Sequence, residues 1–171
     1  MSEKHILVLG VGNLLLGDEG TGVRVIEKLE DEYVFSPNVE LYDGGTLGLR
    51  LLEPFARAGA AIVVDIVHIG GQPGTIYRIE EKDFFKKIPY KSSLHELNVL
   101  ETLIFAEELG GKPETVVIGI EPAEWTSFST ELSAPVRNRL EDIVSAVLKE
   151  IEKAGGSWKK AEQPVRTARA L

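Results

Sequence analysis

The sequence contains no cysteine, and this absence removes several classes of protein chemistry at once. Disulfide bonds, iron–sulfur clusters, thiolate zinc sites and cysteine nucleophiles are all excluded. Histidine is scarce as well, since the chain has three, and there is no Gly-x-Ser-x-Gly motif. Both observations argue against a serine-based catalytic triad. Catalysis or metal binding must therefore depend on carboxylates, on the few imidazoles and on the backbone.

Long apolar segments are also missing. No run approaches the ~18 residues that a membrane-spanning helix needs. The apolar stretch at residues 6–16 is interrupted by two glycines and Asn13 and then meets two acidic residues, unlike a signal peptide. These missing signals predict a cytoplasmic protein without membrane insertion.

Positive charge is in short supply, because 19 Lys and Arg face 27 Asp and Glu, and the net charge is -8. Most surfaces of such a chain repel nucleic-acid phosphate, which argues against a DNA or RNA partner. Residues 153–171 are the exception, with five basic residues and one acidic residue. The glycines, the proline and the few large apolar side chains of this basic tail predict a mobile extension beyond the domain.

Length and composition predict a single domain. The 171 residues lie within the ~100–200 typical of one domain, and 43% hydrophobic with 27% charged residues is usual for a globular chain. We therefore expect one α/β domain over residues 1–152, followed by the basic tail at residues 153–171.

Short apolar runs alternate with longer segments of helical period, which is typical of a parallel sheet wrapped by helices. The pattern predicts an α/β fold with three layers: a twisted, mostly parallel sheet of about five strands, and helices on both faces. The strand at 75–79 follows the preceding one too closely for a helical crossover, so we expect it to be antiparallel. The expected strands cover residues 5–11, 39–42, 60–64, 75–79 and 115–120, and the expected helices cover 21–33, 47–56, 93–109 and a last segment between Pro135 and Gly155.

A glycine-rich turn at residues 10–20 joins the first strand to the first helix, where phosphate loops occur. Its sequence is not that of a phosphate loop. Leu15 replaces the third glycine of the dinucleotide fingerprint, and Asp18 and Glu19 stand where the Walker motif has Lys and Ser or Thr. Two carboxylates favour a cation or a proton-transfer role there. The alternative is that one of them caps the following helix.

Asp65 directly follows a fully apolar central strand, at the carboxyl edge where open α/β sheets bind ligands. The alternative is an aspartate that caps backbone groups at the start of a loop. His68 comes three residues later and either joins the same site or lies exposed in a turn; the second interpretation is favoured.

His95 lies in the first turn of an expected helix, which Ser93 and Glu96 open as a capping box. The helix dipole disfavours an imidazolium there and leaves the neutral ring that a metal needs, although a lone histidine is more often an ordinary surface residue. Together Glu19, Asp65 and His95 would place two carboxylates and an imidazole on one rim of the sheet. Such a set suits a borderline divalent cation and leaves coordination positions open.

A second glycine turn, Asp43-Gly44-Gly45-Thr46, also follows a strand. Its glycines allow a close backbone approach, and Asp43 is a candidate base that could orient a ligand or take a proton. In the alternative interpretation the segment is a tight turn in which Thr46 caps the next helix.

Taken in order, these motifs resemble a known family, the endopeptidases that mature the large subunit of nickel–iron hydrogenases. The similarity extends over about residues 5–151 and does not include the basic tail. Several ordered motifs at family-like spacing are far more specific than any one of them. The matching motifs are Ile6-Leu7-Val8-Leu9-Gly10-Val11-Gly12-Asn13, Gly17-Asp18-Glu19-Gly20, Gly22-Val23, Asp43-Gly44-Gly45-Thr46, Val64-Asp65, Ser93-Leu94-His95-Glu96, Gly119-Ile120-Glu121-Pro122, Leu132-Ser133 and Pro135-Val136.

The resemblance implies an endopeptidase, often grouped as aspartic-type, that removes a C-terminal extension from the precursor of a hydrogenase large subunit after nickel insertion. The family's metal ligands correspond to Glu19, Asp65 and His95, so we expect substrate-borne nickel, or cadmium or zinc in its place, to bind there. Water would attack the peptide bond, with Glu19 and Asp65 in the catalytic site, Asp43 as a helper base and amides of the glycine-rich turn facing the oxyanion. We expect the enzyme to be a monomer.

Two other functions would use the same rim of the sheet. A non-catalytic α/β module could bind a nucleotide or a phosphate there, although Leu15 and the acidic pair Asp18-Glu19 argue against it. A nickel-carrying chaperone would use the same three ligands as the peptidase and would differ only in lacking turnover. Cleavage of a precursor distinguishes these alternatives from the peptidase.

Overall fold

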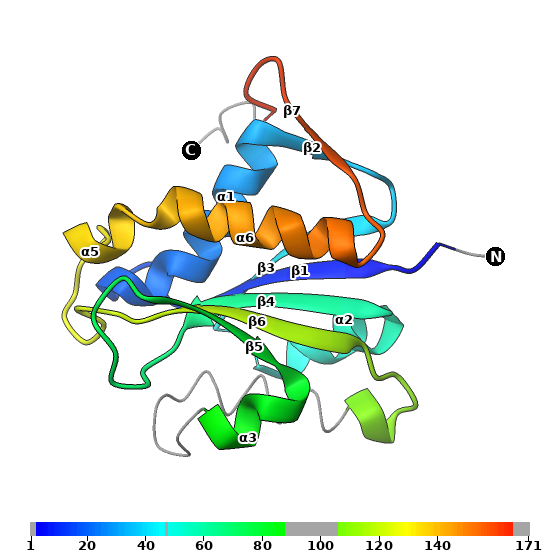
Figure 1. Cartoon of the computed structure of the whole chain (residues 1–171), viewed down its shortest axis with the longest axis horizontal. Coiled ribbons are helices and arrows are strands. Elements are labelled where there is room, and N and C mark those ends of the chain that lie inside the picture. Colours follow the sequence, from blue (N-terminus) through cyan, green and yellow to red (C-terminus); the bar gives the residue numbers. More distant parts are fainter. Residues whose placement is uncertain (1–2, 47, 88–105, 166–171) are drawn as a thin grey trace.

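The computed structural model describes residues 3–46, 48–87 and 106–165. A five-stranded sheet in the order β3-β1-β4-β6-β5 forms its middle layer (Figure 1). Four strands are parallel, and β5 pairs antiparallel with β6 at one edge, which confirms the predicted α/β class and the predicted antiparallel strand. The strands are β1 (Ile6–Val11), β3 (Val39–Gly45), β4 (Ala60–Ile66), β5 (Ile76–Glu80) and β6 (Glu114–Ile120).

Helices cover both faces of the sheet, as predicted (Figure 1). On one face lie α1 (Thr21–Glu32) and α6 (Leu140–Lys153), and on the other lie α2 (Leu52–Arg57) and α3 (Phe84–Lys87). The shorter elements are η1 (Gly17–Gly20), η2 (Gly48–Leu51), η3 (Glu81–Asp83) and α5 (Ala134–Arg137).

Two expected helices differ from the structure or lie partly beyond it. The last helix is divided, because residues 138–139 form a turn between α5 and α6. Of the helix expected at 93–109, only the end is described, and residues 106–108 are helical there. Within the described ranges, no helix has both the length and the apolar character needed to span a membrane.

The two central strands, β1 and β4, are buried along their whole length, as their uninterrupted apolar sequences predict. Their side chains alternate between two cores. Val64 of β4 belongs to the core beneath α1 and α6, whereas Val63 shares the other core with Phe55 of α2. Burying one such side chain contributes about 1.5–3 kcal/mol. The sheet that supports the functional edge is therefore firmly anchored on both sides.

Helix α1 begins directly against the carboxyl ends of β1 and β4. A Cβ atom at Gly10 would overlap the carbonyl oxygen of Gly22, and one at Gly22 would overlap the carbonyl oxygens of Val11 and Val64. Only glycine permits this approach of the two backbones. As a result, the turn that precedes α1 lies at the carboxyl edge of the central strands.

The described part of the basic tail is packed against the domain. β7 (Trp158–Lys160) pairs antiparallel with β2 (Tyr33–Phe35), and the Trp158 ring meets Tyr33 edge-on with centroids 5.3 Å apart. The Ala161 N–H donates to the Glu32 carbonyl at 2.8 Å. Strand pairing and one aromatic contact thus join this segment to the domain, and the expected mobility of the tail stays a prediction. Neither the pairing nor the contact is visible in a composition with few apolar residues.

Candidate functional site

The carboxyl edge of the parallel strands brings three of the four predicted site residues to one end of the domain. Glu19 lies in η1, Asp65 lies near the end of β4 and Asp43 lies near the end of β3. Gly10 of β1 pairs with Asp43 on one side and with Val64, the neighbour of Asp65, on the other. This is the edge at which open α/β sheets bind ligands.

Glu19 and Asp65 are both buried, with 7% and 3% of their surface exposed. Gly12, whose φ is +138°, folds the chain back at the end of β1, and a Cβ there would overlap the Glu19 carbonyl oxygen. The same fold places η1 against β4. Two buried carboxylates at one edge of the sheet offer oxygen donors of the kind that divalent cations bind.

Asp18, the other half of the acidic pair, is fully buried and serves as the anchor of a neighbouring loop. Its carboxylate accepts four hydrogen bonds: from the N–H groups of Ala123 and Glu124, and from both the N–H and the hydroxyl of Ser133. Its own N–H donates to the Glu124 carbonyl at 2.9 Å. Asp18 therefore joins η1 to the loop after β6, and its side chain does not cap α1.

Asp43 is exposed, and its carboxylate accepts a hydrogen bond from the Gly45 N–H at 3.0 Å. The predicted turn is here the last part of β3, which extends to Gly45. Because Asp43 is in register with Gly10 and Val64, it lies in the pleat opposite to that of Asp65. The role of Asp43 as a helper base stays a prediction.

Six backbone amides of the glycine-rich turn are engaged in hydrogen bonds within the protein. The expectation that amides of this turn face an oxyanion stays a prediction. The Gly12 N–H donates to the Gly45 carbonyl, the Gly17 N–H donates to the Ser129 carbonyl, and residues 15, 16, 18 and 19 donate to Asn13, Glu124 or Leu16. Hydrogen bonds within the turn and to Gly45, Glu124 and Ser129 thus hold it in place.

His95 lies outside the described residues. Among residues 3–46, 48–87 and 106–165 alone, no three histidine, aspartate or glutamate side chains are placed to hold one metal ion. The predicted ligand set of Glu19, Asp65 and His95 consequently stays a prediction, of which the described part supplies two buried carboxylates at one edge.

His68 is half-buried, whereas the favoured interpretation made it an exposed turn residue. Its ring lies 4.5 Å from the Trp125 ring, measured between centroids, and its Nδ1 is 3.8 Å from the Glu121 carboxylate. His68 therefore belongs to the packed loops of the same edge.

Glu121 is a buried carboxylate to which the sequence analysis gave no role. It accepts hydrogen bonds from the Ile69 and Gly70 N–H groups at 3.1 Å and from the Tyr77 hydroxyl at 3.0 Å. Burial, and then the bond to Glu121, raise the pKa of Tyr77. Glu121 organises the loop between β4 and β5, and the available signal was its position directly after the last parallel strand.

Comparison with known proteins identifies the family to which the chain belongs. The family model described as hydrogenase maturation protease, HycI, matches residues 23–150. The chain belongs to the hydrogenase maturation protease family. It is thus a peptidase, a hydrolase, and C-terminal processing of the hydrogenase large subunit is the role of this family. This result favours cleavage over the alternatives of a nucleotide-binding module and of a nickel chaperone.

Individual relatives of this maturation protease agree with the family model. The chain is 37% identical over 156 residues to the hydrogenase expression/formation protein HupD of Thiocapsa roseopersicina, covering 90% of this chain and 71% of that protein. It is 34% identical over 148 residues to the hydrogenase 2 maturation protease of Escherichia coli, covering 84% and 90%. The solved structure of the hydrogenase maturating endopeptidase HybD from E. coli superposes with a TM-score of 0.83 at 31% identity, covering 91% and 97%.

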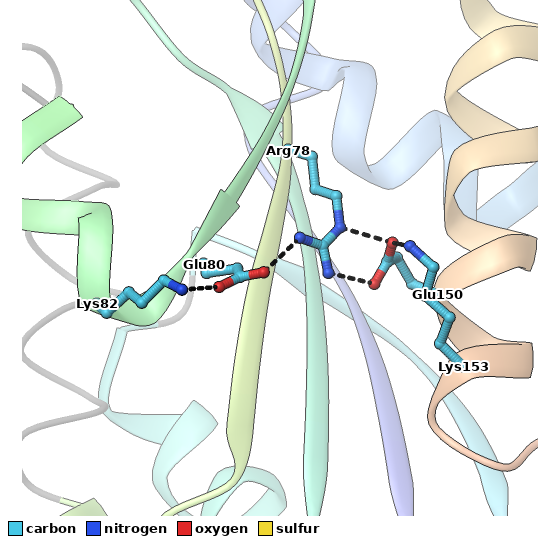
Figure 2. A network of polar contacts seen from close by, with 5 residues as sticks. All are labelled: Arg78, Glu80, Lys82, Glu150 and Lys153. Atoms are coloured by element: carbon cyan, nitrogen blue, oxygen red, sulfur yellow. Dashed lines mark hydrogen bonds and ion pairs between the residues drawn. The ribbon is translucent and has the colours of Figure 1, made fainter.

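A cavity of about 730 Å³ in the described part of this peptidase lies at the opposite edge, between the amino ends of β4 and β6. Five of its charged side chains form one network of ion pairs (Figure 2). Arg78 donates two hydrogen bonds to Glu150, at 2.8 and 3.0 Å, and one to Glu80. Lys82 pairs with Glu80, and Lys153 pairs with Glu150. The bonds from Lys82 and then Arg78 lower the pKa of Glu80 to about 2. A ligand would have to break these ion pairs, so this cavity is a poor candidate for the catalytic site.

Proposed function

We propose that this peptidase removes a C-terminal extension from the precursor of the large subunit of a nickel–iron hydrogenase, and that nickel already inserted into the precursor is the recognition element. The observation that supports the nickel-dependent part is the burial of Glu19 and Asp65 at one edge of the sheet. His95, as the resemblance implies, would complete the set with an imidazole donor.

In this proposal the ligands act mainly by positioning. Glu19, Asp65 and His95 fill vacant positions around the substrate's nickel and so hold the neighbouring peptide bond in one place, which converts an encounter into an oriented reaction. Water then adds to the carbonyl carbon, the carbon–nitrogen bond breaks, and the proton of the water passes to the leaving amine. Asp43, at the same edge but in the opposite pleat, is the proposed base for that proton.

Two matched precursor preparations test the nickel-dependent part. Purified enzyme is mixed with nickel-loaded and with nickel-free large-subunit precursor, and shortening is followed by electrophoresis. We expect the loaded form alone to be shortened. Equal cleavage of both forms would overturn recognition through nickel, and cleavage of neither would overturn the substrate assignment.

The ligand set is tested with His95→Ala. This variant should lose processing of the loaded precursor while it keeps the circular dichroism spectrum of the wild type. The matched control is His5→Ala, because His5 binds Glu40 at 2.8 Å at the amino end of β1, far from the proposed site. Retained processing by His95→Ala would remove His95 from the site.

The proposal also includes a monomeric enzyme in the cytoplasm. Sedimentation of the purified protein should give a single species near its mass of 18.8 kDa. Cell fractionation should recover the protein together with the unprocessed precursor.

A further inference from the structure

Two large apolar side chains stand exposed next to the turn that contains Glu19. Leu15 is 49% exposed and Phe128 is 78% exposed. Leu16 and Ser129 form a parallel β-bridge, in which the Ser129 N–H donates to the Leu15 carbonyl at 2.9 Å and the Gly17 N–H donates to the Ser129 carbonyl at 2.8 Å. Leu15 and Phe128 each precede a partner of this bridge, so the bridge brings their backbones side by side, and we call these two exposed residues the apolar pair.

The loop that presents Phe128 is well hydrogen-bonded. Asp18 anchors it at Ala123, Glu124 and Ser133, as described above. Within the loop, the Glu124 carboxylate accepts the N–H groups of Thr126 and Ser127 at 2.9 and 3.0 Å. These hydrogen bonds lower the pKa of Glu124 to about 2, and the bond from the Thr126 N–H has the largest effect. An ordered loop thus holds a phenyl ring in water, an arrangement typical of an interaction surface.

The charge around the apolar pair has one sign. The sequence has no Lys or Arg between Lys4 and Arg24, and none between Lys112 and Arg137. These two stretches provide the turn and the loop, and their charged side chains are carboxylates. Arg24, which follows the turn in the sequence, is engaged, since it donates to the Thr130 carbonyl and pairs with Glu27. A partner with an apolar side chain and neighbouring basic groups is complementary to such a surface.

We propose that the apolar pair of Leu15 and Phe128 is the docking surface for the segment of the precursor that adjoins the scissile bond. This inference rests on the proposed function. Leu15 precedes Glu19 by four residues in the same turn, which places the pair beside the segment that contains Glu19. The surface is continuous with the proposed catalytic edge and positions an apolar side chain of the client there.

The test compares Phe128→Ser and Leu15→Ser with Leu109→Ser, a control that removes another exposed leucine, 71% exposed, from the turn before β6. Cleavage of nickel-loaded precursor is measured as kcat and KM. Because docking precedes the chemical step, Phe128→Ser should raise KM about tenfold with kcat within about twofold of the wild type, and Leu15→Ser should raise KM by a smaller factor. Phe128→Leu should recover most of the wild-type KM.

Three outcomes overturn the proposal. One is an unchanged KM in both variants, and another is an equal rise in Leu109→Ser. The third is a wild-type protein that dimerises, together with a Phe128→Ser variant that is monomeric and has an unchanged KM. In that case a second copy of the chain would occupy the pair. All three require a wild type that cleaves, so they are distinct from failure of the proposed function, in which the wild type cleaves nothing.

Discussion

Asp18 and Ser133 lie 115 residues apart in the sequence, yet the Asp18 carboxylate accepts both the N–H and the hydroxyl of Ser133 at 2.8 Å. These two bonds join the turn before α1 to the start of α5. The turn that contains Glu19 is thereby fixed by a segment that is distant in the sequence. A carboxylate of this kind acts on the site through its neighbours, which makes Asp18 a positioning residue.

Asp18→Asn tests this anchoring. The amide that replaces one carboxylate oxygen would face N–H donors, so buried donors lose their acceptor at a cost of about 1–3 kcal/mol in the free energy of unfolding. Ser133→Ala removes only the hydroxyl bond and should cost about 1 kcal/mol. Chemical denaturation of both variants measures these losses, and Glu53→Gln, at an exposed carboxylate of α2, is the control. An Asp18→Asn protein as stable as the wild type would contradict the assignment.

Alanine substitutions at Gly12 and Gly70 distinguish the effect of steric overlap from the effect of backbone strain. Both glycines have positive φ, +138° and +92°, but a Cβ at Gly12 would overlap the Glu19 carbonyl oxygen, whereas one at Gly70 has no atom within 4 Å. Gly70→Ala should therefore cost about 1 kcal/mol of stability and keep precursor cleavage. Gly12→Ala should displace η1 and abolish cleavage. Paired measurements of melting temperature and processing check this, and equal effects at the two positions would refute the steric explanation.

The sequence predicts most of the sheet and the edge at which the site lies, because these depend on local patterns. Uninterrupted apolar runs identify β1 and β4, and the short connection before β5 predicts its direction. The role of Asp18 was not predictable, since four donors from residues 123–133 decide it and no local pattern indicates them. The pairing of β2 with β7 was missed for the same reason: it joins segments more than 120 residues apart.

Asp43 and Asp65 are expected to differ in kinetic effect because they lie in opposite pleats. Asp65→Asn keeps the shape of a buried side chain but removes a proposed nickel ligand, so kcat/KM for the loaded precursor should fall at least about 100-fold. Asp43→Asn removes a proposed base from an exposed position. It should lower kcat about 100-fold and leave KM unchanged. Steady-state kinetics distinguish the two patterns, and an Asp43→Asn enzyme with wild-type kcat would exclude Asp43 as the base.

The ion pair of Arg78 and Glu150 should make stability, but not catalysis, depend on pH. Burial alone would raise the pKa of Glu150, but the bonds from Arg78 and Lys153 outweigh it, so the folded-state pKa is lowered below the usual value of 4.5. A carboxylate with a lowered folded pKa stabilises the fold above its unfolded pKa, and this contribution is lost as the pH falls through the folded pKa.

Arg78→Gln should accordingly lower the free energy of unfolding at pH 7 by about 1 kcal/mol. This loss lies between those typical of exposed and of buried ion pairs, because Arg78 is partly exposed. The difference from the wild type should shrink as the pH falls from about 5 towards 3. Urea unfolding at several pH values measures it. Lys112→Gln, which removes an exposed pair with Glu81 and Glu107, is the control and should leave the stability of the wild type nearly unchanged. Both variants should process the precursor normally, because these residues line the edge opposite to Glu19; a loss of processing in Arg78→Gln alone would move the functional site to that cavity.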